Sequence, residues 1–195
     1  EVERIERTGE QVLATARLEA GAALPAPAPH VLARLVRAAL DRATPAYEAR
    51  GAAVELVVAE GPLTVAARAD DVATVVENLV DNAVKYTPGP VKRVEVSVDR
   101  HGAWARLRVE DRGSGVPEAE RASVFDRFYR VGNELTRTAP GLGLGLYLVR
   151  RAVEAMAGRV RLEGRVGGGT VVTVLVPLVA APAARRRRAA ARAVA

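Results

Sequence analysis

The stretch Asp71–Pro88, DVATVVENLVDNAVKYTP, predicts an amphipathic helix with two different faces. Apolar residues recur along one face at the three-and-four spacing of a helix that packs on a core. They are Val72, Val75, Val76, Leu79, Val80, Ala83 and Val84. Asp70 or Asp71 stands at the start of this stripe and is expected to serve as the N-cap.

Three polar residues form the second face of this helix, and they are Asn78, Asn82 and Lys85. An amide oxygen is a hard, neutral ligand that suits Mg²⁺, an ion that proteins usually share with substrate phosphates. Lysine adds a positive point charge for phosphate. From this helix alone, a magnesium and phosphate site and an ordinary solvated flank are equally good interpretations.

Length and composition restrict the class of protein. The 195 residues suit one domain, and no cysteine is present, so disulfides and thiolate metal sites are excluded. Arg185–Arg188 and Arg192 supply +5 of the net charge of +6. This composition favours a disordered tail over an arm that binds nucleic acid or anionic lipid. Because the chain starts at Glu1, we expect a fragment of a longer polypeptide.

The N-terminal part divides at a proline-rich segment. Glu1–Gly21 has a narrow apolar stripe, which suggests a helix taken from a coiled coil or bundle. Three prolines make Leu24–Pro29 an extended linker. Val31–Leu40 then has the pattern of a second amphipathic helix, which Pro45 is expected to end or kink.

Two single strands and two hairpins are predicted from short apolar or alternating runs. Their ranges are Val54–Val58, Leu63–Ala66, Val94–Val98 with Ala105–Val109, and Arg159–Glu163 with Val171–Val176. His101 lies at the first hairpin turn and His30 follows a proline, so neither histidine is assigned to catalysis.

A carboxylate and two glycines follow the first hairpin, in Asp111-Arg112-Gly113-Ser114-Gly115. A buried carboxylate can accept hydrogen bonds from an amine such as that of adenine, and glycines let a backbone approach a ligand closely. Taken alone, the motif is also typical of a simple turn. Thr170, at the end of the glycine-rich turn of the second hairpin, could complete the same pocket or belong only to that turn.

An aromatic cluster and a glycine-rich segment come next. Phe125 and Phe128 are predicted to be structural, whereas Arg130 and Arg137 flank a polar loop and could reach a phosphate. Gly141–Leu146, GLGLGL, is expected to open a helix that ends near Ala157. Glycines there would leave the first backbone amides of the helix accessible, and these amides would form a phosphate site. The same glycines would equally serve as hinges of a mobile segment.

The order of these motifs resembles the ATP-binding catalytic domain of sensor histidine kinases. The matching segments are NLVDNAVKYTP, DRGSG, FDRFYR, GLGLGL and GGGT, and the resemblance covers Val31–Leu178. It implies an α/β fold of the Bergerat type, a two-layer sandwich in which helices cover one face of a mixed, mainly antiparallel sheet. The superfamily also contains gyrase-type topoisomerases and a heat-shock chaperone.

The resemblance also implies roles for individual residues. Asn82 would hold Mg²⁺, while Asn78, Lys85 and Arg130 would act in catalysis. The ATP-binding set would be Asn82, Lys85, Tyr86, Asp111, Gly113, Gly115, Arg137, Gly141, Leu142, Gly143, Leu144, Gly145, Leu146 and Thr170. Leu142 departs from the small hydroxyl residue that the family often has between the glycines. The loop from Val131 to Pro140 would be a mobile lid.

The expected reaction is phosphoryl transfer from Mg-ATP to a histidine. Hydrolytic members of the superfamily carry a glutamate base where this chain has Asn78, so water would be poorly activated. By resemblance, the acceptor histidine lies on a dimerisation bundle that is missing here. The expected organisation is residues 1–23 as part of a bundle helix, 24–30 as linker, 31–179 as catalytic domain and 180–195 as disordered tail.

The expected partners are the parent protein's own phosphoacceptor domain and a response-regulator receiver domain, with no nucleic acid. The parent would be a homodimer anchored in the cell membrane with this domain in the cytoplasm, and the fragment would be monomeric. The alternatives are a serine kinase of the partner-switching, anti-sigma type and an ATP-sensing pseudokinase. The serine kinase would lack the upstream helix and linker. The pseudokinase is disfavoured because every predicted ATP-binding position carries a suitable residue.

Overall fold

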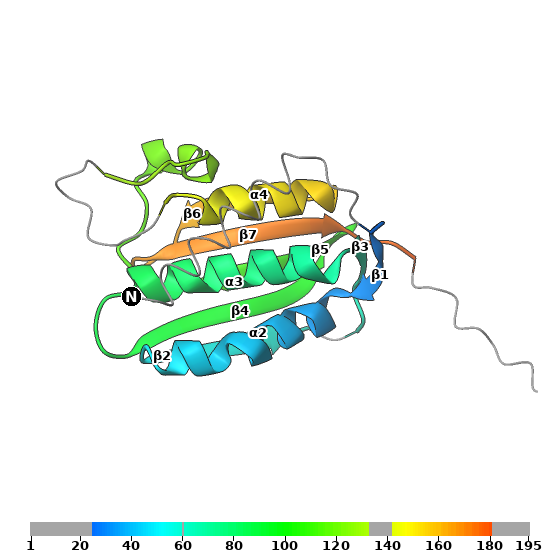
Figure 1. Ribbon diagram of the computed structural model, residues 1–195, viewed down its shortest axis with the longest axis horizontal. Helices are drawn as coiled ribbons and strands as arrows, with labels where there is room; N and C mark the ends of the chain where they lie inside the picture. Colours follow the sequence, from blue (N-terminus) through cyan, green and yellow to red (C-terminus); the bar gives the residue numbers. More distant parts are fainter. Residues whose placement is uncertain (1–24, 60, 133–141, 181–195) are drawn as a thin grey trace, which may run out of the picture.

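The computed structural model describes residues 25–59, 61–132 and 142–180 and shows a sheet with helices on one face (Figure 1). The elements are β1 (Ala28–Val31), α2 (Leu32–Glu48), β2 (Ala52–Val58), β3 (Thr64–Ala67), α3 (Ala69–Tyr86), β4 (Lys92–His101), β5 (Trp104–Glu110), η1 (Glu118–Glu120), η2 (Ser123–Phe125), α4 (Gly145–Ala155), β6 (Arg159–Gly164) and β7 (Thr170–Pro177). Within the described residues, no helix is both long enough and apolar enough to cross a membrane.

The main sheet has five strands in the order β2-β4-β5-β7-β6. Strands β2 and β4 are parallel, and every other neighbouring pair is antiparallel. Helix α3 lies between α2 and α4, and all three stand in front of the sheet in Figure 1. The predicted fold class, a mixed and mainly antiparallel sheet covered on one face by helices, is confirmed.

The core lies between α3 and the sheet. All seven apolar residues of the predicted helix stripe are buried. On the strands, Val94, Val96 and Val98 of β4 and Ala105, Leu107 and Val109 of β5 are buried as well. The hairpins β4–β5 and β6–β7 have the predicted strands, and the alternation of apolar and polar residues sets which face of each strand packs on the helices.

Pro45 was expected to end or kink helix α2, and the first alternative is wrong because the helix continues past Pro45 to Glu48. The missing N–H of proline removes one helical bond. Its carbonyl still accepts from the backbone N of Ala49 at 3.1 Å. The last turn therefore persists because proline lies close to the helix end and loses only that one bond.

The segment predicted as linker contributes a strand. Ala28, Pro29 and His30 belong to β1, which pairs antiparallel with β3 in a separate two-stranded sheet. Proline is tolerated in such an edge strand because its missing N–H can face away from the partner. The extended conformation was predicted from the prolines, but the pairing depends on β3 and was not.

The start of α3 also differs from expectation. The N-cap residue is Arg68, which makes no side-chain capping bond, and Asp70 and Asp71 lie in the first helical turn. Asp71 Oδ2 lies 2.8 Å from Arg68 Nε. Acidic side chains there still stabilise the helix through its dipole, so the two aspartates support the helix start without capping it.

Candidate functional site

The polar face of α3 meets the start of α4. Asn78, Asn82 and Lys85 are half-buried on the flank of α3, beside the buried stripe. The Asn78 amide nitrogen Nδ2 donates to the Thr74 carbonyl at 2.8 Å. Asn78 Oδ1 would lie 2.9 Å from a Cβ atom added to Gly145, the first residue of α4. The amide face predicted from spacing thus borders the end of α4 that begins with a glycine.

Helix α4 begins with backbone donors that the helix itself does not satisfy. Its N-cap residue is Leu144, which makes no side-chain capping bond, and the Leu148 N–H donates to the Leu144 carbonyl at 2.9 Å. The amides of residues 145–147 precede this bond and have no acceptor within the helix. The N-terminal end of a helix attracts anions through these donors and its dipole. This end of α4 can therefore receive a phosphate.

Gly143 occupies a position that only glycine fits. Its φ is +73°, and an added Cβ would lie 2.6 Å from the Tyr129 carbonyl oxygen and 2.7 Å from the carbonyl carbon of Phe128. The Phe128 N–H in turn donates to the Gly143 carbonyl at 3.1 Å. The glycine-rich segment is therefore fastened to the aromatic segment by direct backbone contact.

The carboxylate of Asp111 joins the ends of β5 and β7. It is 7% exposed. Its Oδ1 accepts from the Gly113 N–H at 2.7 Å and from the Thr170 N–H at 3.2 Å, and its Oδ2 accepts from the Thr170 hydroxyl. Each carboxylate oxygen can accept about two hydrogen bonds, so Oδ2 retains capacity for one more donor. The structure thus brings Asp111 and Thr170 together, as the predicted pocket requires.

Gly113 lies directly against this carboxylate. A Cβ on Gly113 would lie 2.6 Å from the Tyr86 carbonyl oxygen, which shows that the loop after β5 packs directly on the end of α3. Gly115 has φ of +75° and faces Gly169. Any side chain at Gly113 would therefore separate Asp111 from α3.

Three more predicted residues gather at the C-terminal end of α3. Lys85 Nζ lies 5.0 Å from the centre of the Tyr86 ring. Burial raises the pKa of Tyr86, while the positive charge of Arg130 opposes this shift, so Arg130 lies within electrostatic range of the phenol. Lys85 and Arg130 thus place positive charge at the same end of the helix.

Phe128 is not part of the core, so its predicted structural role is wrong. Phe125 is buried, but Phe128 is 57% exposed and has φ of +64°. Its backbone bond to Gly143 holds this left-handed conformation, which turns the ring outward beside the Arg127 guanidinium. Leu144 also differs from its neighbours, because its side chain is buried while Leu142 is 40% exposed.

Glu120 is a positioning residue that sequence reasoning missed. Its Oε2 accepts from the Tyr129 hydroxyl at 2.8 Å and from the Gly132 N–H at 3.4 Å. The hydrogen bond to this carboxylate raises the pKa of Tyr129. No spacing rule links residues nine apart in an irregular segment, so only the structure reveals this support of the aromatic segment.

Two of the predicted residues, Arg137 and Gly141, lie outside the described residues, as does most of the predicted lid. Of the others, Asn78, Asn82, Lys85, Tyr86, Asp111, Gly113, Gly115, Arg130, Leu142, Gly143, Leu144, Gly145, Leu146 and Thr170 lie along α3, the end of β5, the aromatic segment, the start of α4 and the start of β7. Asn78 and Tyr86 are separated by about 12 Å of helix axis at 1.5 Å per residue.

The described residues fit a nucleotide and a shared magnesium ion. Gly113 and Gly143 allow close backbone packing on Tyr86 and on Tyr129 around the site, and Asp111 keeps an acceptor position. Among the described residues, no group of three or more histidine, cysteine, aspartate or glutamate side chains could hold a metal. Mg²⁺ commonly takes one or two protein ligands and completes its shell with phosphates and water, which agrees with an amide ligand such as Asn82.

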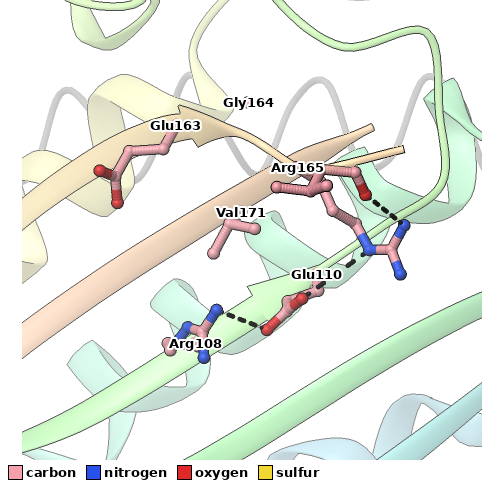
Figure 2. A pocket seen from close by; sticks show the side chains of 7 residues that line it. Arg108, Glu110, Glu163, Gly164, Arg165 and Val171 are labelled. Atoms are coloured by element: carbon pink, nitrogen blue, oxygen red, sulfur yellow. Dashed lines mark hydrogen bonds and ion pairs between the residues drawn. The ribbon is translucent and has the colours of Figure 1, made fainter. Parts of the chain in front are cut away.

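A separate hollow of about 380 Å³ lies on the opposite face of the sheet (Figure 2). Glu110 lies there between Arg108 at 2.7 Å and Arg165 at 3.8 Å. Because side chains alternate along a strand, Glu110 points away from the helices, whereas buried Val109 points toward them. This hollow is therefore not part of the site formed by Asp111 and α3.

Comparison with known proteins gives a family for most of the folded part. Residues 67–180 match the model of the histidine kinase-, DNA gyrase B- and HSP90-like ATPases. The chain is 40% identical over 132 residues to the signal transduction histidine-protein kinase/phosphatase MprB of Mycolicibacterium vanbaalenii, covering 67% of this chain and 27% of that protein. It is 39% identical over 110 residues to the sensor protein kinase WalK of Staphylococcus saprophyticus, covering 55% of this chain and 18% of that protein.

Solved structures agree with these relatives. A mycobacterial sensor histidine kinase MprB structure has a TM-score of 0.66 and 27% identity, covering 78% of this chain and 97% of that one. Full-length ShkA in complex with AMPPNP has a TM-score of 0.76 and 28% identity, covering 92% of this chain and 37% of that one. The chain spans only about a quarter or less of the curated relatives named here. It belongs to the family of histidine kinase-, DNA gyrase B- and HSP90-like ATPases, and its named relatives are sensor histidine kinases.

Proposed function

We propose that this chain is the catalytic ATP-binding domain of a sensor histidine kinase. It would bind Mg-ATP and transfer the γ-phosphate to a histidine on the parent protein's dimerisation helix, for relay to an aspartate of a response regulator. The observation that carries this proposal is the meeting of Asn78 with Gly145, which sets the amide face of α3 against the open end of α4. The position of Asp111 beside the end of α3 adds a base-binding group along the same helix.

Each side chain has a role in this proposal. Asp111, oriented by Thr170, accepts a hydrogen bond from the adenine amine. Lys85 and Arg130 contact phosphate, and the amides at the start of α4 donate to it. Asn82 holds Mg²⁺ with support from Asn78, and the bound ion supplies neutralisation of the phosphate charge.

The character of Asn78 supports transfer over hydrolysis. A carboxylate at this position could take a proton from water, but a neutral amide cannot. Its Nδ2 is already a donor to the Thr74 carbonyl, which fixes the orientation of the amide. Catalysis would then consist of positioning and charge stabilisation for an incoming imidazole, as phosphoryl transfer requires.

Exposed apolar side chains border this site and fit a docking helix. Phe128, Val131 and Leu142 are 57%, 38% and 40% exposed. The backbone bond between Phe128 and Gly143 holds the segments of Phe128 and Leu142 together. Exposed apolar groups gathered near a reactive site indicate an interaction surface, and we assign it to the histidine-bearing bundle.

The proposal extends to the parent protein. Residues 1–23 would be the end of a bundle helix, 24–30 a linker, 31–179 the catalytic domain and 180–195 a disordered tail. The parent would be a membrane-anchored homodimer with this domain in the cytoplasm, and the fragment itself would be monomeric. Light scattering over a range of concentrations tests the last point, and a dimer that persists on dilution would contradict it.

Calorimetric titration of ATP, with and without magnesium, tests the site. We expect magnesium-dependent binding that is lost in Asn82→Ala and in Asp111→Asn. Asp41→Asn, at an exposed position on α2, is the matched control and is expected to bind as the wild type does. Equal binding by all variants would refute the assigned site, and binding without transfer to a supplied histidine-bearing bundle would identify a pseudokinase.

A further inference from the structure

A second hollow lies at the edge of the sheet, away from the nucleotide site. It has a volume of about 430 Å³ and is lined by Arg121, Ala122, Phe125, Arg150, Val160, Arg161 and Leu162. Phe125 and Leu162 are buried and form an apolar floor with Val160. The lining holds three arginines and no acidic residue, so the hollow combines an apolar base with a positive rim.

The hollow runs along an unpaired strand edge. Strand β6 stands at the edge of the main sheet, and within the described part of the chain it pairs only with β7. In an antiparallel pair, alternate residues direct their N–H and C=O groups toward the partner, so the intervening groups of β6 face outward. Among the described residues, no further backbone partner of Arg159–Gly164 is present. Val160, Arg161 and Leu162 therefore offer both side chains and backbone to an incoming segment.

The arginines of the rim are accessible to new carboxylates. Arg121 donates through Nε to the Val116 carbonyl at 3.1 Å and has no carboxylate partner among the described residues. Arg161 lies 3.2 Å from Glu163, and Arg150 lies 3.0 Å from Asp126. Both acidic side chains are at least half exposed. Exposed pairs of this kind contribute little free energy, so an incoming carboxylate can replace them.

We propose that this edge hollow is a docking site for an extended acidic segment of another protein. The segment would add as a strand beside β6, insert an apolar side chain over Phe125 and Leu162, and place its carboxylates on Arg121 and Arg161. Addition of a strand to a free sheet edge is a general mode of peptide recognition. Charge complementarity selects this occupant, because the chain's own arginine-rich end or a second copy of this edge would be repelled by the rim.

The test uses the full chain and a synthetic peptide that alternates aspartate with valine. Fluorescence anisotropy is expected to show binding that weakens as salt is added. A peptide with lysine in place of each aspartate has the same alternation and is expected not to bind. Amide hydrogen exchange of Val160–Leu162 is expected to slow when the acidic peptide is present.

Charge reversal locates the site. The double variant that carries Arg121→Glu and Arg161→Glu is expected to bind the peptide about tenfold more weakly or worse. A tenfold loss of affinity corresponds to about 1.4 kcal/mol. Arg161→Glu alone leaves the Arg121 contact with Val116 intact and is expected to give a smaller loss. Arg93→Glu, at an exposed position on β4, is the control and is expected to change nothing.

Four outcomes would overturn the proposal. The first three are no binding of the acidic peptide, equal binding of the lysine peptide, and binding without slower exchange in β6. An equal loss in Arg93→Glu would show only general attraction to a positive protein and would also reject it. None of these measurements uses nucleotide, so their failure is distinct from failure of the proposed kinase function.

Discussion

The side-chain oxygen of Asn78 lies 2.9 Å from the point that a Cβ atom on Gly145 would occupy, so the middle of α3 and the first residue of α4 meet without space for a methyl group. The contact joins two motifs that are 67 positions apart in the sequence. It explains why the first helical position of α4 is a glycine although its φ is not positive. The constraint arises from the neighbouring amide.

Gly145→Ala is expected to displace the Asn78 amide and to weaken ATP binding about tenfold or more, which is the scale of one lost hydrogen bond to a charged group. Alanine suits a helical position, so the free energy of unfolding is expected to fall by no more than about 1 kcal/mol. Calorimetric titration and urea denaturation measure the two effects.

A double-mutant cycle gives the control for this prediction. In an Asn78→Ala background the obstructing oxygen is absent, so adding Gly145→Ala is expected to cause no further loss of affinity. If Gly145→Ala weakens ATP binding as much in the Asn78→Ala background as in the wild type, the alanine acts on the α4 amides and not on Asn78.

Thr170→Val is expected to lower the free energy of unfolding by about 1.5–3 kcal/mol, because the Thr170 hydroxyl donates to the buried carboxylate of Asp111. Thr170→Ser keeps the hydroxyl and is expected to retain most of the stability. Urea denaturation compares the three proteins, and a valine variant as stable as the wild type would contradict the structural role of this bond.

Tyr129→Phe is expected to make unfolding less sensitive to alkaline pH. The bond to Glu120 raises the pKa of Tyr129 above its ordinary value of 10.0. A raised folded-state pKa contributes stability that is present below the unfolded-state value and is lost as pH rises through the folded-state value. Wild-type stability should therefore fall more steeply above pH 10.0 than that of the variant.

The control for Tyr129→Phe is Tyr147→Phe. The Tyr147 hydroxyl makes no hydrogen bond with the described residues, so its removal is expected to leave the free energy of unfolding at neutral pH unchanged. Denaturation at a series of pH values provides the slopes, and identical slopes for wild type and Tyr129→Phe would count against the Glu120 bond.

Leu79→Ala is expected to lower the free energy of unfolding by about 2–5 kcal/mol, the usual cost of a cavity in a packed core. Leu79 is 2% exposed and belongs to the buried stripe of α3. Leu142→Ala makes the same chemical change at a position that is 40% exposed and is expected to cost less than about 0.5 kcal/mol. Comparable losses in the two variants would refute the assigned packing of α3.

The sequence was most informative where one periodic signal decided the structure. The stripe from Val72 to Val84 and the alternation around His101–Gly102 each follow from a single repeat, and the structure confirms the helix and the hairpin. The motif order also assigned Asp111 and Thr170 to one pocket, although their direct bond depends on the pairing of β5 with β7.

The failures arose where distant contacts override local preference. Pro29 joins a strand because β3 offers a partner. Pro45 is the exception, since it stays helical for a local reason, its place near the helix end. Phe128 was expected to have a structural role like that of Phe125, but its backbone is held by Gly143 in a conformation that directs the ring outward. No local pattern reports such constraints.

The hydrogen bonds between Asp111 and Thr170 join residues 59 positions apart in the sequence, so they form late in folding. The hairpins β4–β5 and β6–β7 join residues close in sequence and can form early, whereas the pairing of β5 with β7 must first close this long loop. During synthesis, Asp111 emerges well before its partner. Its carboxylate therefore acquires its final hydrogen bonds only after β7 has been synthesised and has paired with β5, so this part of the site is completed after the two hairpins.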